Sequence, residues 1–375
     1  MNILIISTYG GFLTSFEIDN IKLWISKGNK VFLMSNFSDL NYNKEPEKLN
    51  GLDVKVINSD FTRSFKNTKI RKTIKEIRKV IKENNINILE CHNPIVSALA
   101  RIAANKEKVK KIIYTVHGFF FYKGCSFKRK LIYRSIENHL AKKTDVIITT
   151  NIEDYEYSKN MKVKDKTFYV HGVGVDVDSI DKLEVDKELV RQECGVSKDD
   201  FLMASVGECI DRKNHEIIIK ALSRIRNNKL KYVLIGDGEK FEYLKSLAKE
   251  LQVSDRVIFL GYRKDANRII KACDLYVFPS KQEGLSVALM QAMAVGLPVV
   301  CSRIRGNIDC IDDGKGGHTF DLNDEKELDN SILACINNKD LLVKYGKYNQ
   351  IKVKSFSKQN VLLEMSKIYD YVLMR

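Results

Sequence analysis

The chain has 375 residues, of which 44% are hydrophobic and 30% are charged. That length is too great for one ordinary core and sufficient for two α/β domains, and only four prolines occur, so no disordered linker is indicated. The net charge is +15, and residues 1–150 contain 27 Lys and Arg against 13 Asp and Glu. This concentration of positive charge predicts attraction to an anionic membrane surface or to nucleic acid.

Two further classes are excluded by composition. No apolar run approaches about 18 residues, so no transmembrane helix is expected. The cysteines show no Cys-x-x-Cys pair and no histidine at ligand spacing, which indicates reduced, mostly buried thiols in a cytoplasmic protein and neither a disulfide framework nor a zinc site. They are Cys91, Cys125, Cys194, Cys209, Cys273, Cys301, Cys310 and Cys335.

The first part of the chain alternates apolar strand-like runs with helical patterns, which is typical of a parallel sheet covered by helices. Its first residues, MNILIISTYGG, lack a basic leader and predict a β-strand instead of a signal peptide. Gly10 and Gly11 are expected in the loop after that strand, where glycine lets the backbone approach a ligand. The strands expected in this part are 3–7, 30–35, 88–91, 111–117 and 145–150.

Two helical segments of this first part are strongly basic. Residues 65–84 place four isoleucines (Ile70, Ile74, Ile77, Ile81) on one face, which favours packing against the sheet, with a basic outer face that could lie against anionic lipid. A second basic helix is expected at 127–143. The aromatic residues just ahead of it could meet a lipid tail or belong to the core.

The strand pattern restarts in the second half of the chain. Residues 167–186 contain two glycines and a charged tail, and we interpret them as the link between domains; Asp176 and Asp178 in this link are not expected to bind a metal. We therefore expect two Rossmann-like doubly wound domains, residues 1–178 and 179–355, facing a central cleft, and a final helix at 356–375. The later strands are expected at 201–207, 232–238, 257–261, 275–280 and 298–302.

The most informative segment is 283–302, EGLSVALMQAMAVGLPVVCS. It predicts a loop, a helix that begins near Ser286 and ends at Gly296, and a following strand. Free N–H groups and the positive end of the dipole at a helix N-terminus suit a phosphate or a sugar hydroxyl. Glu283 precedes the helix by several residues, so we expect its carboxylate to face a ligand.

Residues 205–215, SVGECIDRKNH, predict a cationic site. Arg212 and Lys213 end a loop that follows the first strand of the second domain. They precede a helix, so they can neutralise a diphosphate whose charge grows as it leaves.

The 283–302 segment resembles the donor-sugar motif of retaining family 4 glycosyltransferases, in which two glutamates lie eight positions apart. Glu283 matches the first, and Gln291 occupies the place of the second. The runs TVHGFFFYKG (115–124), IEDYEYSKN (152–160) and VHGVGVD (170–176) resemble bacterial capsule and exopolysaccharide glycosyltransferases of the same family. The resemblance covers nearly the whole chain and implies the two-domain GT-B fold, in which the first domain binds the acceptor, the second binds the nucleotide sugar and the final helix crosses back to the first domain.

The resemblance also implies roles for individual residues. Glu283 and His117 would contact the donor sugar, and Gln291 would contact the ribose, with a loss of about 1 kcal/mol relative to a glutamate. Glu208 stands where many members have an arginine, which leaves Lys213 and Arg212 as the expected phosphate ligands. The remaining donor contacts would come from Gly10, Gly11, Gly236, Gly238, Tyr262, Arg263, Gly284, Leu285 and Ser286, with Arg305 and Asn307 undecided. On the acceptor side the expected residues are Phe119, Tyr122 and Lys123.

These features together predict a retaining glycosyltransferase that moves a sugar from a nucleotide sugar, expected to be a UDP-sugar, to a polyprenyl-diphosphate-linked saccharide. The enzyme would act at the inner face of the plasma membrane, bound peripherally, and would require no metal. Two other interpretations remain open from the sequence: a GT-B nucleotide-sugar epimerase, and a non-catalytic sugar-nucleotide-binding relative suggested by Gln291 and Glu208. Binding to nucleic acid is not expected, because no nucleic-acid motif accompanies the charge.

Overall fold

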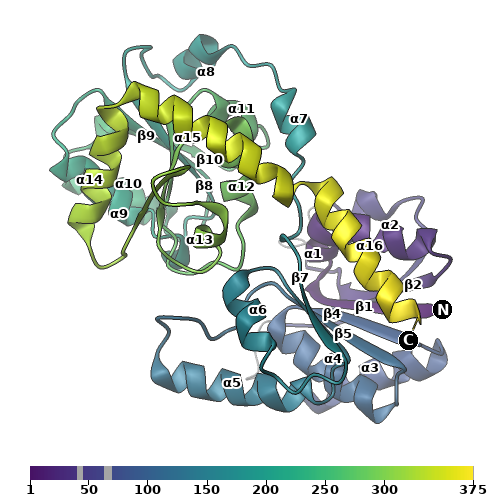
Figure 1. Ribbon diagram of the computed structural model, residues 1–375. Helices are drawn as coiled ribbons and strands as arrows, with labels where there is room; N and C mark the ends of the chain where they lie inside the picture. Colours follow the sequence, from purple (N-terminus) through teal and green to yellow (C-terminus); the bar gives the residue numbers. More distant parts are fainter. Residues whose placement is uncertain (40–44, 63–69, 375) are drawn as a thin grey trace. The chain divides into compact units, whose positions relative to one another are not determined.

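The computed structural model describes residues 1–39, 45–62 and 70–374 and divides into two compact units. The first unit comprises Met1–Val173 and Gln359–Arg375, and the second comprises Gly174–Lys358. Each unit is a parallel β-sheet with helices on both faces (Figure 1), so the predicted α/β class is confirmed. The expected boundaries at 178/179 and 355/356 differ from the observed divisions by a few residues.

The sheet of the first unit has seven parallel strands in the order β3-β2-β1-β4-β5-β6-β7. Its strands are nearly continuous apolar runs, as buried parallel strands require, and β4 is buried along its whole length. The strands are β1 (Asn2–Tyr9), β2 (Lys30–Asn36), β3 (Val54–Asn58), β4 (Ile88–His92), β5 (Lys111–Val116), β6 (Val146–Thr149) and β7 (Lys166–Tyr169).

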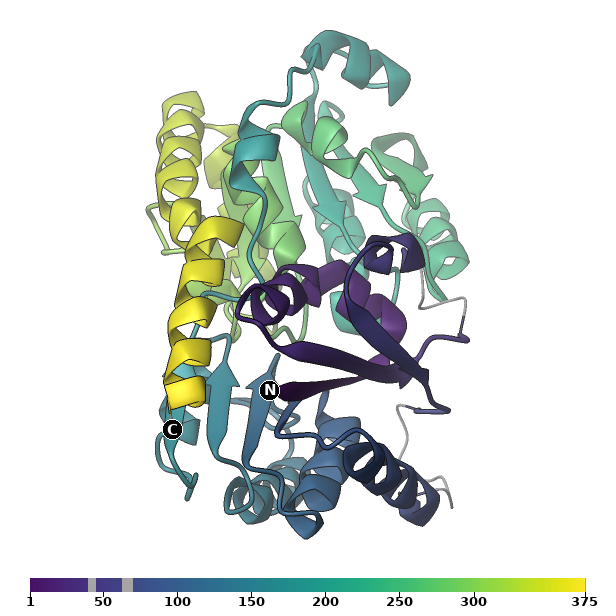
Figure 2. The same ribbon diagram turned by 90° about the vertical axis from the view of Figure 1, so that its right-hand side faces the viewer.

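Two hydrophobic clusters cover the two faces of this sheet. On one face Tyr369 stacks on Trp24 with ring centroids 3.8 Å apart, so the last helix lies beside α2 (Figure 2). The opposite face is covered by α3 and α4, and α5 contacts α4. The helical segments of this unit are α1 (Gly10–Phe12), η1 (Leu13–Glu17), α2 (Ile18–Ser26), η2 (Pro46–Leu49), α3 (Ile70–Glu83), α4 (Pro94–Lys106), α5 (Phe127–Ala141), α6 (Ile152–Ser158) and α16 (Lys358–Met374).

Several expectations for this unit are confirmed and two are corrected. The isoleucine face of α3 does pack on the core, although residues 65–69 of the expected helix lie outside the described residues. The expected helices at 127–143 and 356–375 correspond to α5 and α16. The segment 167–186 is more than a link, because it contributes most of strand β7 and the helix α7 (Val177–Asp181), which Asp176 caps. Strand β3 was missed, since none of its residues is fully buried and its short sequence, VKVIN, carries only a weak apolar signal.

The sheet of the second unit has six parallel strands in the order β10-β9-β8-β11-β12-β13. The first strand of this unit, β8, lies between β9 and β11, just as β1 lies between β2 and β4 in the first unit. The strands are β8 (Phe201–Val206), β9 (Leu230–Ile235), β10 (Val257–Gly261), β11 (Leu275–Phe278), β12 (Val299–Ser302) and β13 (Gly317–Phe320).

Helices cover both faces of the second sheet and complete two further apolar clusters. All eight cysteines are free thiols, and six of them are fully buried, as the sequence predicted. The remaining helical segments are α8 (Lys187–Glu193), η3 (Asp211–Lys213), α9 (Glu216–Arg224), α10 (Phe241–Glu250), η4 (Ser254–Arg256), α11 (Ala266–Lys271), α12 (Val287–Val295), α13 (Asn307–Cys310), α14 (Glu325–Ile336), α15 (Lys339–Lys352) and η5 (Val353–Phe356).

Candidate active site

In each unit the order of strands reverses beside the first strand, between β1 and β4 and between β8 and β11. In open parallel sheets, ligands bind beyond the carboxyl ends of the strands at such a reversal, because neighbouring connections leave on opposite faces and open a crevice. The loops that follow β8 and β11 carry Arg212, Lys213 and Glu283. The structure therefore places these three predicted site residues at the reversal of the second sheet.

The carboxylate of Glu283 binds both cationic side chains. Its Oε1 accepts hydrogen bonds from Arg212 Nη1 and from Lys213 Nζ, each at 2.8 Å. Arg212 Nη1 also donates to the carbonyl oxygen of Gln282 at 2.9 Å, and Lys281 N donates to the carbonyl of Arg212, so the two loops are tied together. Two cations converging on one carboxylate oxygen leave an excess of positive charge at this point.

Burial and the neighbouring charges shift the pKa of the Glu283 carboxyl in opposite directions. Its side chain is only 9% exposed, and burial by itself raises the pKa of the carboxyl. The charges of Lys213 and Arg212 outweigh that effect, and the pKa of Glu283 is lowered below its ordinary value. Glu283 is therefore an ionised hydrogen-bond acceptor and not a proton donor at neutral pH.

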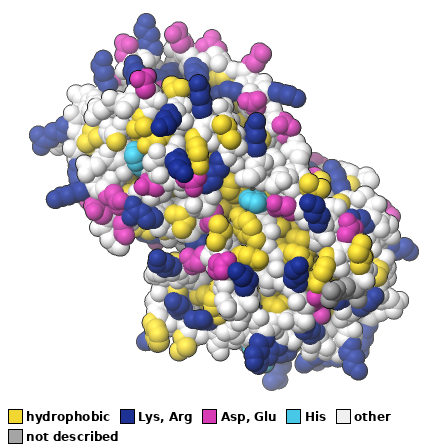
Figure 3. All heavy atoms as spheres, viewed as in Figure 1, with side chains coloured by type: hydrophobic (Ala, Val, Ile, Leu, Met, Phe, Trp, Pro, Cys, Tyr) yellow, Lys and Arg dark blue, Asp and Glu magenta, His cyan; other side chains and the backbone are white. Residues whose placement is uncertain are grey.

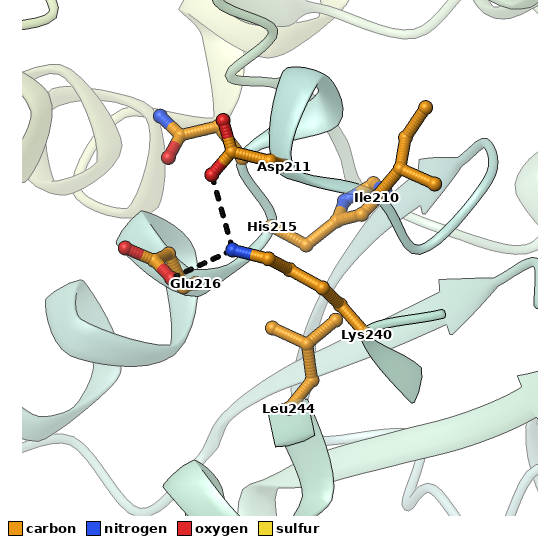
Figure 4. Close-up of a pocket in the computed structure, with 7 residues that line it drawn as sticks. Ile210, Asp211, His215, Glu216, Lys240 and Leu244 are labelled. Carbon is orange, nitrogen blue, oxygen red and sulfur yellow. Dashed lines mark hydrogen bonds and ion pairs between the residues drawn. The ribbon is translucent and has the colours of Figure 1, made fainter. Parts of the chain in front are cut away.

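The turn that contains Arg212 and Lys213 is also fixed by ion pairs of Asp211, the residue that precedes them. Asp211 Oδ1 accepts hydrogen bonds at 3.0 Å from Lys240 Nζ and from Lys281 Nζ, and these contacts lower its pKa. Figure 4 shows Lys240 reaching between Asp211 and Glu216 in a small pocket lined by Ile210, Asp211, Asn214, His215, Glu216, Lys240 and Leu244. Carboxylates neutralise Lys240, so the pocket carries no excess positive charge and serves to fix the turn.

Residues 284–286 lead into α12, as the sequence predicted. Ser286 caps the helix, with its Oγ accepting from Leu289 N at 3.4 Å, and Gly296 in the left-handed region ends it. Gly284 is packed tightly, because a Cβ on Gly306 would lie 2.2 Å from the carbonyl oxygen of Gly284. Leu285 packs against the core, and Gln291 lies half-buried on α12. The N-terminus of α12 thus follows the loop that carries Glu283.

Gly236 and Gly238 have a structural role that the sequence did not reveal. A Cβ on Gly236 would lie 1.8 Å from the carbonyl oxygen of Gly207, and one on Gly238 would lie 2.8 Å from that of Cys209. Both glycines also have φ near +153°, which strongly favours glycine. They allow the loops after β8 and β9 to pack together, and this close packing accounts for them without a ligand.

The contacts of the remaining predicted donor residues differ. Arg263 forms a two-point ion pair with Asp265, with both distances 2.7 Å, so its guanidinium is engaged locally. Tyr262 is 62% exposed. Arg305 is buried and donates to the carbonyl oxygen of Glu283 at 3.1 Å, whereas Asn307 is fully buried and bonds to Ser302. Of these, Arg305 is the residue that directly supports the Glu283 loop.

The expectation of a glycine loop after β1 is wrong. Gly10 and Gly11 are buried and begin the helical segment α1, which continues into η1 and α2. A Cβ on Gly10 would lie 2.2 Å from the ring of Phe37, so the close approach permitted by Gly10 is to an aromatic side chain. Their assignment as donor contacts stays a prediction.

His117 lies directly after β5, in a buried polar cluster. Its Nε2 is 3.1 Å from His92 Nδ1 and 3.7 Å from Glu17 Oε1, and its ring makes an edge-to-face contact with the ring of Phe12. Burial lowers the pKa of His117 to about 4, and burial together with the nearby His117 lowers the pKa of His92 well below its ordinary value, so both imidazoles are neutral. Glu17, His92 and His117 form the only group of three or more His, Cys, Asp or Glu side chains with the spacing of metal ligands among the residues that the structure describes. A neutral His117 can position a hydroxyl group by hydrogen bonding.

Sequence reasoning missed the carboxylates of this cluster. Glu90, in the middle of β4, accepts from Trp24 Nε1 at 2.7 Å and from Tyr369 OH at 3.0 Å. Burial raises the pKa of Glu90 to about 7, and burial together with Glu90 raises that of Glu17 to about 8. The signal was present in the run ILECH (88–92), where a glutamate and a histidine interrupt an otherwise apolar buried strand.

The predicted acceptor-side residues divide between core and surface. The acceptor-side assignment of Phe119 is corrected. Its ring is fully buried, stacks on Phe121 with centroids 4.9 Å apart and belongs to the core of the first unit. Tyr122 is half-buried beneath the guanidinium of Arg129. Lys123 is exposed, and its backbone N–H donates to Glu153 at 2.7 Å.

Comparison with known proteins agrees with this arrangement. Residues 186–352 match the family Glycosyl transferases group 1, and residues 25–151 match Glycosyl transferase 4-like. The chain is 30% identical over 302 residues, 79% of each chain, to a Bacillus subtilis protein described as the glycosyltransferase EpsD. It is 29% identical to an Escherichia coli UDP-Gal:alpha-D-GlcNAc-diphosphoundecaprenol alpha-1,3-galactosyltransferase, over 80% of this chain and 78% of that one.

The same fold occurs in solved structures. Anabaena HepE in complex with UDP superimposes over the full length of both chains with a TM-score of 0.79 at 19% identity. Within the described part of this chain, no helix combines the length and apolarity needed to cross a membrane. On the family matches and on the relationship to EpsD, the chain belongs to the group 1 glycosyltransferases and is an enzyme with the GT-B fold.

Proposed function

We propose that this glycosyltransferase moves a sugar from a UDP-sugar to a hydroxyl group of a polyprenyl-diphosphate-linked saccharide, with retention of the anomeric configuration, during synthesis of a bacterial surface polysaccharide. The observation that carries the proposal is the convergence of Arg212 and Lys213 on Glu283 at the strand-order reversal of the second unit. The name of the E. coli relative contains both a UDP-sugar donor and a diphosphoundecaprenol acceptor, which supports this substrate pair.

The two cations are suited to a leaving diphosphate. They share one carboxylate oxygen, so one positive charge remains uncompensated and can attract the donor. As the bond between the sugar and the diphosphate breaks, negative charge accumulates on the phosphate oxygens, and fixed cations stabilise it without reorganisation. Lys213 and Arg212 thus supply the charge that a metal would otherwise provide, and we propose that no metal cofactor is required.

Glu283 is better suited to holding the sugar than to attacking it. Two charge-assisted hydrogen bonds withdraw electron density from its carboxylate and lower its pKa, which reduces its nucleophilicity. We therefore assign Glu283 to the hydroxyl groups of the donor sugar and keep the assignment of His117 to the same sugar. The acceptor oxygen would bond to the anomeric carbon on the face that the diphosphate leaves, and its proton would pass to the departing phosphate.

The acceptor and the charge distribution together suggest where the enzyme acts. A polyprenyl-diphosphate-linked saccharide is confined to a bilayer, and the first 150 residues carry nearly all of the net charge. Anionic phospholipids attract such a segment by about 1 kcal/mol for each basic residue near the surface. We propose peripheral binding at the inner face of the plasma membrane.

The direct test is transfer from a panel of UDP-sugars to a polyprenyl-diphosphate saccharide, with the linkage determined by NMR. Glu283→Ala should abolish transfer while the protein keeps its circular dichroism spectrum, and EDTA should leave the wild-type rate unchanged. A free, altered sugar nucleotide as the product would identify an epimerase. UDP binding without turnover in both the wild type and Gln291→Glu would identify a non-catalytic binding protein.

A further inference from the structure

The cluster of Glu17, His92 and His117 in the first unit brings three potential metal ligands to one point. His92 Nδ1 lies 3.1 Å from His117 Nε2, and Glu17 Oε1 lies 3.6 Å from the first nitrogen and 3.7 Å from the second. Atoms that bind one ion tetrahedrally at about 2.0–2.1 Å lie about 3.4 Å from one another. The observed spacing is therefore that of ligands around a common ion.

Hydrogen bonding by itself leaves this cluster incomplete. At 3.6 and 3.7 Å, Glu17 Oε1 is too far from both imidazoles for a hydrogen bond. His92 is fully buried, and its Nε2 has no hydrogen-bond partner among the residues that the structure describes. Buried polar atoms are usually paired, so these unmet contacts indicate a role beyond packing.

Neighbouring groups would hold the ligands in place. Asn20 Nδ2 donates to Glu17 Oε2 at 2.8 Å, which leaves Oε1 for the two histidines. The unpaired Nε2 of His92 lies 3.8 Å from Glu90 Oε1. If His92 binds an ion through Nδ1, its proton must lie on Nε2, and a closure of roughly 1 Å would let that N–H donate to Glu90. A histidine that binds a metal usually donates its other N–H to a carboxylate in this way.

The charges of the cluster match a divalent cation. Both imidazoles are neutral, which is the form that binds a metal. Glu17 and Glu90 are buried, and within the described part of the chain neither carboxyl is paired with a lysine or an arginine. Two ionised carboxylates would balance the two charges of the ion.

The backbone brings Glu17 to this position in an unusual way. Leu13–Glu17 form a π-helix between α1 and α2, and such turns are rare and often occur at functional sites. The side chain of His117 is 22% exposed, so the cluster can be reached from solvent.

We propose that Glu17 Oε1, His92 Nδ1 and His117 Nε2 bind a divalent transition-metal ion such as Zn²⁺, with water in a fourth position. Two histidines and a glutamate are a common ligand set for zinc, whereas Mg²⁺ and Ca²⁺ prefer oxygen ligands. On binding, the proton between the two rings would move to an outer ring nitrogen, and the Glu17 carboxyl would release its proton to solvent. The rings would turn so that both lone pairs face the ion.

This metal site is separate from the cationic site proposed for the diphosphate. Its ligands all belong to the first unit, whereas Arg212, Lys213 and Glu283 belong to the second. The ion is therefore no cofactor of transfer. The proposed function assigns His117 to the donor sugar, so an ion that fixes this ring should slow transfer, and this consequence alone rests on the proposed function.

The test uses the full-length protein, treated with EDTA and desalted, at about pH 8, where Glu17 can lose its proton. Co²⁺ can replace Zn²⁺ in such sites, and its visible absorption is intense only in protein sites of low coordination number. The wild type should bind one equivalent of Co²⁺ with this absorption, Zn²⁺ should displace it and Mg²⁺ should not. A wild type that shows no such absorption would overturn the proposal without any variant.

Variants assign the binding to these side chains. Glu90→Gln, which alters only the outer contact, should weaken Zn²⁺ binding by roughly 10- to 100-fold, and Glu17→Gln, which removes a ligand charge, should weaken it further. Zn²⁺ should raise the melting temperature of the wild type and leave that of Glu17→Gln unchanged. The matched control is His171→Asn, which removes a histidine paired with Glu364 at 2.7 Å and should bind Zn²⁺ like the wild type.

Binding to other histidines is the alternative outcome. Figure 3 shows histidine side chains to be few and well apart on the face that it draws. Equal Zn²⁺ affinity of Glu17→Gln and the wild type would assign the ion to such residues and overturn the proposal. Each of the other four histidines bonds to a side chain of another type: His139, His171, His215 and His318.

Transfer measures the consequence for activity. One equivalent of Zn²⁺ should inhibit the wild type, EDTA should restore the rate, and Glu17→Gln should resist the same Zn²⁺ concentration, which separates inhibition at this site from chelation by the sugar nucleotide. Absence of transfer by the metal-free enzyme would refute the proposed function and leave the Co²⁺ spectrum as evidence for the site. An undiminished rate in enzyme saturated with Zn²⁺ would refute the inhibitory effect.

Discussion

Replacing Lys213 by Met removes one ammonium group from the cationic site and keeps most of the aliphatic side chain. The ammonium lies 2.8 Å from Glu283 Oε1 and 4.9 Å from the centre of the Phe278 ring, and the side chain is only 11% exposed. Methionine retains the packing of the stem against this ring, so the substitution mainly tests the charge.

The expected effect on donor binding follows from the loss of one charge-assisted contact. A hydrogen bond to a charged group contributes about 1.5–3 kcal/mol, which corresponds to a roughly 10- to 150-fold rise in the Kd for UDP. The expected cost in stability is smaller, because Arg212 remains 2.8 Å from Glu283 and the buried carboxylate keeps a partner. We expect that cost to be about 1–2 kcal/mol.

Isothermal titration calorimetry with UDP measures the first quantity, and thermal unfolding measures the second. The matched control is Lys245→Met, which removes an exposed lysine of α10 that pairs with Glu242. It should change neither quantity appreciably, because exposed ion pairs contribute little. A UDP affinity of Lys213→Met equal to that of Lys245→Met would refute the assignment of Lys213 to the diphosphate.

Three further outcomes are expected. Gln291→Glu should tighten UDP binding by about 1 kcal/mol, because a carboxylate can accept hydrogen bonds from both ribose hydroxyls, and calorimetry showing no gain would contradict a ribose contact. Gly236→Ala should lower the melting temperature and weaken UDP binding, since its Cβ would meet a carbonyl at 1.8 Å, whereas Gly195→Ala, at positive φ but with open space around it, should cost only about 1 kcal/mol. The pKa values of Glu17 (about 8) and Glu90 (about 7) exceed the ordinary 4.5, so the folded first unit binds more protons than the unfolded chain and its stability should fall as pH rises from 6.5 to 8. Glu17→Gln should flatten that fall in a thermal melt, and a melting temperature that rises over this interval would contradict the raised pKa values.

The sequence predicted the candidate site residues well where they lie close together in the chain. Glu283 and Ser286 belong to one short segment, and Arg212 and Lys213 are neighbours in another, so their residue types and spacing were informative before any folding. Strand-like apolar runs also predicted two parallel sheets, because strands buried on both faces cannot alternate with polar residues.

Other assignments needed the folded chain because they depend on contacts between distant residues. The resemblance places the loop containing Gly236 beside the donor, yet the conformation of Gly236 is explained by its close approach to the carbonyl of Gly207. Phe119 precedes a basic helix, and the sequence left open whether its ring meets a lipid tail or belongs to the core; the structure encloses the ring in the core.

The amino-acid sequence by itself therefore determined the fold class and the family, and it identified the charged groups that we propose to contact the donor. Only the tertiary structure decided that Arg212 and Lys213 both donate to one oxygen of Glu283, and that Glu17, Glu90 and two histidines form a buried polar cluster with Trp24 and Tyr369. The physical reason is that pairing energies and pKa shifts arise from distances of a few ångströms between residues that are up to 279 positions apart in the chain.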